Sequence, residues 1–158
     1  MTQVLIIYRV DKSYPENAGV VKKLIGQVEG FKHSNCHVDY VIHDNQHIYL
    51  NNQSIYKPKS IGTLFKWNYF NYINSSTLGR YDICLVRYGL ATLSLTNFLK
   101  NFRESNQNAK ILLDMPTYPY RQEHGGLSGK IKMLIDGLLS NRLKSNVNYV
   151  LHLSLIHI

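Results

Sequence analysis

Residues 82–115, DICLVRYGLATLSLTNFLKNFRESNQNAKILLDM, contain a strand–helix–strand pattern from which the fold class can be predicted. Both ends of this stretch carry short, continuous apolar runs, at 82–88 and 109–115, which are typical of strands covered on both faces of a parallel sheet. Between them, residues 92–104 turn one apolar stripe inward as a helix: Leu95, Phe98, Leu99 and Phe102. Two such strands joined through a helix predict an α/β protein.

The same alternation continues on both sides of this unit. Further strands are predicted at 3–8, 37–42 and from 148 onward, and further helices at 20–32, 60–75 and 127–144. The runs HIYL and SIYK flank Asn51 and Asn52, and because asparagine tolerates a positive φ, they predict a hairpin. The expected fold is therefore a doubly wound, mostly parallel sheet with a small β-hairpin insertion near 47–56.

The apolar stripes of two helices predict how they pack. The helix at 20–32, with Asn17 as its cap, is expected to bury Val20, Val21, Leu24, Ile25, Val28 and Phe31. Gly26 and Gly30, four residues apart, predict a close approach of this helix to the sheet. The helix at 127–144 is expected to bury Leu127, Ile131, Leu134, Ile135, Leu138 and Leu139.

Composition limits the classes of protein that need considering. A chain of 158 residues with 44% hydrophobic and 18% charged residues forms one domain with a real core. The net charge of +8 favours anionic partners. Cys36 and Cys84 lack CxxC spacing, which favours a reducing cytoplasm over a disulfide framework. There is no leader-like segment, and no apolar run approaches the roughly 20 residues of a membrane span.

Three loops that follow strands carry candidate binding residues, because ligands of open α/β sheets bind beyond the carboxyl ends of the strands. The first loop, 9–19, ends in Asn17, Ala18 and Gly19 at a helix N-terminus, where a phosphate is favoured. It contains neither a dinucleotide fingerprint nor a P-loop, and an ordinary polar connection is the alternative. The second loop places Arg87 and Tyr88 at the same sheet edge. Arg87 is interpreted as a clamp for an anion or a sugar hydroxyl, or as a surface cation paired with Asp114 or Glu123.

The third loop, 114–124, is the richest in chemistry. Its tyrosines offer stacking faces with hydroxyl groups, and its carboxylates and histidine supply proton-transfer capacity, which together suit a sugar site. The candidates are Asp114, Pro116, Thr117, Tyr118, Tyr120, Glu123 and His124. The alternative is a rigid loop packed by its own tyrosines.

Two further features are assigned ordinary roles. The histidines His33, His37, His43 and His47 lack HxxxH spacing on one element, so we expect scattered surface imidazoles and no metal. The basic residues of the helix at 127–144 suit anionic lipid headgroups or a solvated outer face: Lys130, Lys132, Arg142 and Lys144.

At these loops the sequence resembles the N-terminal domain of bacterial family-4-type glycosyltransferases of the GT-B fold, particularly those of capsule and cell-surface polysaccharide synthesis. The resembling stretches are 4–31, 37–56 and 81–123, and MPTYPY at 115–120 is the most specific piece. The chain departs from the family where Ala18-Gly19 replaces a common Gly-Gly pair.

The resemblance implies a retaining hexosyltransferase that moves a sugar from a nucleotide-sugar donor to a glycan or lipid-linked acceptor. Residues 1–152 would then be an incomplete acceptor-side domain, with the donor-binding domain absent and the fragment inactive alone. LSLIHI at 153–158 is interpreted as a non-native tail, with an edge strand as the alternative.

The resemblance also implies roles for the loop residues. Asn17, Ala18 and Gly19 would approach the donor phosphate, and Asp114, Glu123 or His124 would accept the acceptor's proton. The cleft would be lined by Arg9, Tyr14, Arg87, Tyr88, Pro116, Thr117, Tyr118 and Tyr120.

The setting expected for such an enzyme is the cytoplasm or the inner face of the cell membrane. We expect no metal or other cofactor, an anionic membrane surface as a further partner, and no nucleic acid. The competing hypothesis is a basic phospholigand-binding or nucleic-acid-binding module without enzymatic activity, motivated by the +8 charge.

Overall fold

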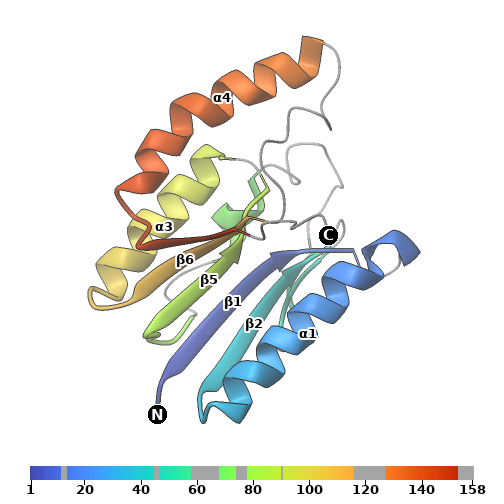
Figure 1. Ribbon diagram of the computed structural model, residues 1–158, viewed down its shortest axis with the longest axis vertical. Helices are drawn as coiled ribbons and strands as arrows, with labels where there is room; N and C mark the ends of the chain where they lie inside the picture. Colours follow the sequence, from blue (N-terminus) through green and yellow to red (C-terminus); the bar gives the residue numbers. More distant parts are fainter. Residues whose placement is uncertain are drawn as a thin grey trace, which may run out of the picture.

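A computed structural model describes residues 1–11, 14–44, 47–57, 68–73, 78–89, 91–115 and 127–152. In this part of the chain, seven strands form one sheet in the order β4-β3-β2-β1-β5-β6-β7, with helices on both sides (Figure 1). The strands are β1 (Gln3–Arg9), β2 (His37–His43), β3 (Ile48–Leu50), β4 (Gln53–Tyr56), β5 (Ile83–Arg87), β6 (Lys110–Met115) and β7 (Tyr149–His152).

The sheet is mostly parallel, as predicted. Strands β2, β1, β5, β6 and β7 pair in parallel, while β3 and β4 add an antiparallel hairpin to the β2 edge. At the hairpin turn Asn51 and Asn52 have φ values of 49° and 70°, which explains why asparagines stand there. The α/β doubly wound fold and the hairpin insertion are confirmed.

The helices lie on both sides of this sheet. Helix α1 (Ala18–His33) covers one side, and α3 (Leu93–Ser105) and α4 (Leu127–Lys144) lie on the other (Figure 1). The side-chain oxygen of Thr92 caps α3 by accepting from the N–H of Leu95 at 3.1 Å. One turn of 3₁₀ helix, η1 (Pro15–Asn17), precedes α1.

The predicted helix at 60–75 lies largely outside the described residues. Within it the structure describes 68–73, where η2 (Tyr69–Tyr72) is a single 3₁₀ turn. Tyr69 and Phe70 of this turn are buried, and the ring of Phe70 lies 5.3 Å from that of Phe98 on α3.

Alternating residues of the central strands feed two cores, one on each side of the sheet. The α1 side contains Val4, Ile6, Tyr8, Val10, Leu24, Val28, Val38, Ile42 and Leu85. The larger core, under α3, η2 and α4, includes Leu5, Ile7, Val86, Leu95, Phe98, Leu99, Phe102, Ile111, Leu113 and Leu143. The four inward residues predicted for α3 are all buried.

Two expectations about α1 are wrong. Leu24 and Val28 are buried, but Ile25 is 56% exposed, because it lies on the flank of α1 that faces the hairpin rather than under the helix. A Cβ at Gly26 or Gly30 would meet nothing within 4 Å, so these glycines do not mediate a close approach to the sheet.

The expected apolar face of α4 is wrong for two of its six residues, while Leu139 packs partly buried against the larger core as expected. The side chains of the other three, Leu127, Ile131 and Ile135, lie outside the described part of the structure. Leu134 and Leu138 are both 68% exposed, whereas Leu143 is buried. A polar contact explains why these two leucines face outward. The Asp136 carboxylate accepts hydrogen bonds from the Tyr88 hydroxyl and from the N–H of Ala91. Asp136 therefore points toward the end of β5 and turns the neighbouring leucines outward.

None of the described helices is long and apolar enough to cross a membrane. Strand β7 ends at His152, and the predicted non-native tail at 153–158 lies outside the described residues.

Candidate functional site

Three neighbouring strands place polar side chains in one row at their carboxyl ends. Ile7 pairs with Val86, so the next residues, Tyr8 and Arg87, are neighbours, and Arg87 pairs with Asp114. Tyr8, Arg87 and Asp114 all point to the α1 side, and we call them the polar row. The row spans the point between β1 and β5 where the strand order reverses, which is where open α/β sheets bind ligands.

Helix α1 completes the polar row from above. The Lys23 ammonium donates to both carboxylate oxygens of Asp114, at 2.7 and 2.8 Å. The Tyr8 hydroxyl lies 2.6 Å from Oε1 of Gln27 and 3.0 Å from Oδ2 of Asp114, and its single proton serves one of these acceptors at a time. Asp114 is thus held by groups from both α1 and β1.

Arg87 is held less tightly than Lys23. Its Nη1 lies 3.4 Å from Oδ2 of Asp114, and its guanidinium carbon lies 5.4 Å from the centre of the Tyr8 ring. Burial, together with the charge of Asp114, raises the pKa of the Tyr8 phenol, so this hydroxyl stays protonated. The row with Lys23 therefore contains two cations and one carboxylate.

Beyond the polar row, the α1 side of β6 and β7 is an apolar surface. Leu112 joins the core on the α1 side and pairs with Tyr149, and Asp114 pairs with Leu151. Since paired residues of parallel strands share a face, Tyr149 and Leu151 lie on this side. They are 56% and 42% exposed. We call Leu112, Tyr149 and Leu151 the β6–β7 face.

Among the described elements, none covers the β6–β7 face. Helix α1 packs over β1 and β2, and α3 and α4 lie on the opposite side of the sheet (Figure 1). Parallel sheets are normally covered on both faces, so this exposed apolar surface on the last two strands calls for an explanation.

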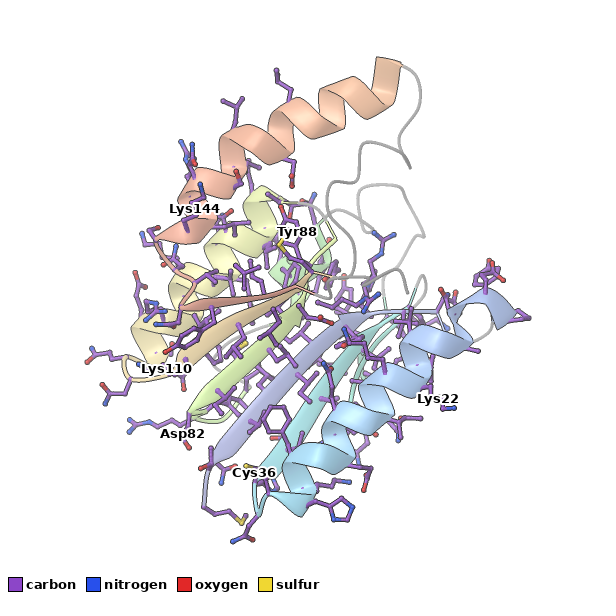
Figure 2. All side chains as sticks on the ribbon, in the orientation of Figure 1. Lys22, Cys36, Asp82, Tyr88, Lys110 and Lys144 are labelled. Carbon is purple, nitrogen blue, oxygen red and sulfur yellow. The ribbon has the colours of Figure 1, made fainter. Side chains whose placement is uncertain are left out.

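Tyr88 was predicted to line the same cleft as Arg87, but its side chain points to the other side of the sheet. It belongs to the core under α3 and α4, and its hydroxyl donates to Asp136. Figure 2 shows it at the carboxyl end of β5, with Asp82 at the opposite end. Its role here is to tie α4 to the end of β5.

The predicted residues of the first loop do not join the polar row through any contact in the described structure. Arg9 ends β1 on the opposite face, where its charge acts on His43 and Tyr69. Tyr14 is 49% exposed. Asn17 gives α1 no side-chain cap and instead donates to the carbonyl of Asp11 at 2.8 Å, while Ala18 and Gly19 are exposed in the first turn of α1.

Six predicted site residues fall outside the described part of the chain, in the segment 116–126. They are Pro116, Thr117, Tyr118, Tyr120, Glu123 and His124. Of the three candidate proton acceptors, the structure therefore describes Asp114 alone. Asp114 pairs with Arg87, as the surface-cation alternative expected, but the Arg87 side chain is only 17% exposed and so is not a surface cation.

Sequence reasoning missed Tyr8, Lys23 and Gln27. Lys23 and Gln27 are one helical turn apart on the flank of α1 that faces β5, and a pair of polar residues at that spacing beside an apolar stripe was the available signal.

Within the described residues, no three His, Cys, Asp or Glu side chains come together as a metal site. Cys36 and Cys84 are free thiols, and burial raises the pKa of Cys84.

The expectation of surface histidines is wrong for His43. Its ring is buried at the end of β2 and stacks on Tyr69, with ring centres 4.3 Å apart. Burial, and to a smaller extent the charge of Arg9, lowers the pKa of His43 to about 3. The imidazole is therefore neutral at pH 7.

This burial predicts a pH-dependent stability. The unfolded chain protonates His43 below about pH 6.5, whereas the folded chain does so only near pH 3, so stability is lost as the pH falls through this window. Between pH 7 and 4.5 the wild type should lose about 2–3 kcal/mol more than His43→Phe, which keeps the stacked ring. Denaturant unfolding at both pH values measures this difference. The exposed control His33→Phe should follow the wild type, and equal slopes for wild type and His43→Phe would contradict the prediction.

Comparison with known proteins finds solved structures of low similarity and no family. No family model matches the chain, and no curated protein matches it. Among solved structures, the response regulator TrrA of Thermotoga maritima, in complex with Mg²⁺-BeF, is 12% identical with a TM-score of 0.45, over 99% of this chain and 90% of that chain. A complex of the histidine kinase ThkA with TrrA gives 11% identity and a TM-score of 0.45, with the same coverage. At this similarity we assign no activity from either structure.

The comparisons overturn the predicted family. The similar structures are response regulators and not glycosyltransferases, and no family model matches. The prediction of a glycosyltransferase is therefore wrong, and with it the predicted nucleotide-sugar donor, glycan or lipid-linked acceptor and membrane surface. The competing hypothesis of a phospholigand-binding or nucleic-acid-binding module finds no support either. The physical reason is that apolar strands followed by polar loops recur across doubly wound folds that differ in function.

Proposed function

We propose that this chain is a protein-binding domain that takes an acidic amphipathic helix on its β6–β7 face, beside α1. The observation that carries the proposal is the exposure of Tyr149 and Leu151 on the uncovered side of the last two strands. Apolar side chains exposed together on a parallel sheet favour a covering element, because burying them removes apolar area from water.

A helix fits this surface better than a strand. The sheet already packs α1 against β1 and β2 on the same side, and helices on the faces of a parallel sheet are the usual covering layer. A second helix laid over β6 and β7 would lie next to α1 and bury Leu112, Tyr149 and Leu151 together. Such a helix carries its apolar residues at three-residue and four-residue spacings.

Charge decides the kind of partner. At the carboxyl end of the face, Lys23 and Arg87 oppose the single carboxylate of Asp114, which leaves an excess positive charge. The whole chain carries +8, so a second copy would meet like charge, whereas an acidic partner would be attracted. The partner that fits is a helix with an apolar stripe flanked by Glu or Asp.

A labelled synthetic helix of about five turns, with leucines on one face and glutamates beside them, tests the proposal by fluorescence anisotropy. The double variant Tyr149→Ser, Leu151→Ser should weaken binding at least about tenfold, because these are the two exposed apolar side chains that the docked helix would bury. The matched control Leu93→Ser removes an exposed leucine on α3 and should bind like the wild type. Circular dichroism confirms that each variant is folded.

Two outcomes would overturn the proposal. The first is equal binding of a matched peptide in which lysines replace the glutamates, since the charge argument would then be wrong. The second is a concentration-dependent dimer of the chain, seen by analytical ultracentrifugation and abolished by Tyr149→Ser, Leu151→Ser, since the face would then bind a second copy.

The same proposal includes a cytoplasmic location. Cys36 and Cys84 are free thiols, and a reducing compartment preserves them.

A further inference from the structure

Arg87 offers more hydrogen-bond donors than the described part of the chain uses. A guanidinium carries five N–H groups in a planar fork. One of these groups, on Nη1, donates to Oδ2 of Asp114 at 3.4 Å, which is long for an ion pair, and a second interaction is a side-chain hydrogen bond with Tyr8. Two contacts leave part of the fork unused. The side chain is nevertheless 17% exposed and held over the Tyr8 ring, so the fork is fixed in place and reaches solvent.

The short contacts of Asp114 are made by other groups. Lys23 donates to both of its oxygens below 3 Å, and the Tyr8 hydroxyl lies within hydrogen-bond distance of Oδ2. Lys23 and Arg87 both pair with this one carboxylate, so the group of three keeps one positive charge in excess in a half-buried place. A cation in such a place is stabilised by an anion that also accepts its hydrogen bonds.

From this geometry we infer that Arg87, aided by Lys23, recognises one carboxylate of the helix that docks on the β6–β7 face. This inference rests on the proposed function and adds the residue that selects the partner. Arg87 lies beside Asp114 in the sheet, and Asp114 lies beside Leu151 of the face, so an acidic residue at the end of a docked helix comes within reach of the fork.

The chemistry favours a carboxylate over a phosphate. One carboxylate matches the single excess charge, whereas a phosphate dianion would bring an extra negative charge next to Asp114. A carboxylate also accepts two parallel N–H bonds from a guanidinium, which an ammonium cannot offer in the same geometry. Arg87→Lys should therefore retain the attraction and lose the paired hydrogen bonds.

A double-mutant cycle tests this inference with the synthetic helix described above. The first change is Arg87→Gln, and the second replaces by Gln the peptide Glu at the helix end that docks nearest Arg87. Each change should weaken binding about tenfold, and the two together should cost little more than either alone. Arg87→Lys should lie between the wild type and Arg87→Gln. Arg142→Gln removes an exposed cation of α4 and serves as the control, with unchanged binding.

A second measurement separates failure of this inference from failure of the proposed function. The protein is titrated separately with sodium acetate, sodium phosphate and sodium chloride. Acetate should shift the Arg87 Nε–H resonance in NMR spectra more than either other salt. Additive effects in the cycle, with the peptide still bound, would overturn the carboxylate site and leave the docking face. An acetate shift without any peptide binding would overturn the docking face and leave the carboxylate site, and a larger shift with phosphate would contradict the assignment of a carboxylate.

Discussion

Replacement of Asp114 by alanine is expected to lower the free energy of unfolding by about 3–5 kcal/mol at pH 7. Asp114 is 2% exposed and accepts hydrogen bonds from Lys23 and Arg87. Without its carboxylate, two cations remain close together beside the Tyr8 ring, and the short hydrogen bonds of Lys23 disappear. Urea unfolding monitored by circular dichroism measures the loss, with the midpoint and slope fitted separately.

Two further variants distinguish the charge of Asp114 from its shape. Asp114→Asn keeps the shape and one acceptor oxygen, so its loss should be smaller than that of alanine. Asp82→Ala removes a carboxylate at the opposite end of the same strands, where Oδ2 accepts one hydrogen bond from the N–H of Gln3, and should cost less than about 1 kcal/mol. An Asp114→Ala protein within about 1 kcal/mol of the wild type would contradict the central place given to this carboxylate.

The elements of the fold were predictable because local patterns specify them. The apolar runs of β1, β5 and β6 and the inward stripe of α3 contain the same residues that the structure buries. The asparagine pair predicted the hairpin for the reason observed, a positive φ at both residues. In each case one segment contains all the information that its conformation needs.

The rotation of α4 was not predictable in the same way. Its leucines suggested one buried stripe, but Asp136 finds the Tyr88 hydroxyl and the N–H of Ala91, which lie more than 40 residues away in sequence. A buried backbone N–H requires an acceptor, and meeting that requirement outweighed the burial of Leu134 and Leu138. The spacing of apolar residues predicts a helix, but it does not reveal the polar groups on the elements against which that helix packs.

In the candidate site too, some residues were predictable from local sequence and others depend on the whole fold. Because parallel strands end at one edge of the sheet, their order along the chain was enough to find Arg87 and Asp114. Lys23 joins them from a helix 91 residues earlier, and that pairing depends on how α1 crosses the sheet. The β6–β7 face is likewise a property of the whole fold, since Tyr149 and Leu151 read as ordinary core residues until the elements on each side are placed.

Replacement of Phe102 by alanine is expected to cost about 3–5 kcal/mol of stability, because it opens a cavity in the larger core. Phe102 is fully buried on α3, and the centre of its ring lies 6.0 Å from the ring centre of Phe98 and 6.3 Å from that of Tyr81. Phe102→Leu restores part of the lost volume and should cost clearly less. Leu93→Ala, at an exposed position of the same helix, should stay within about 0.5 kcal/mol of the wild type. Urea unfolding of the three variants ranks them, and a Phe102→Ala protein as stable as Leu93→Ala would mean that α3 does not pack through this ring.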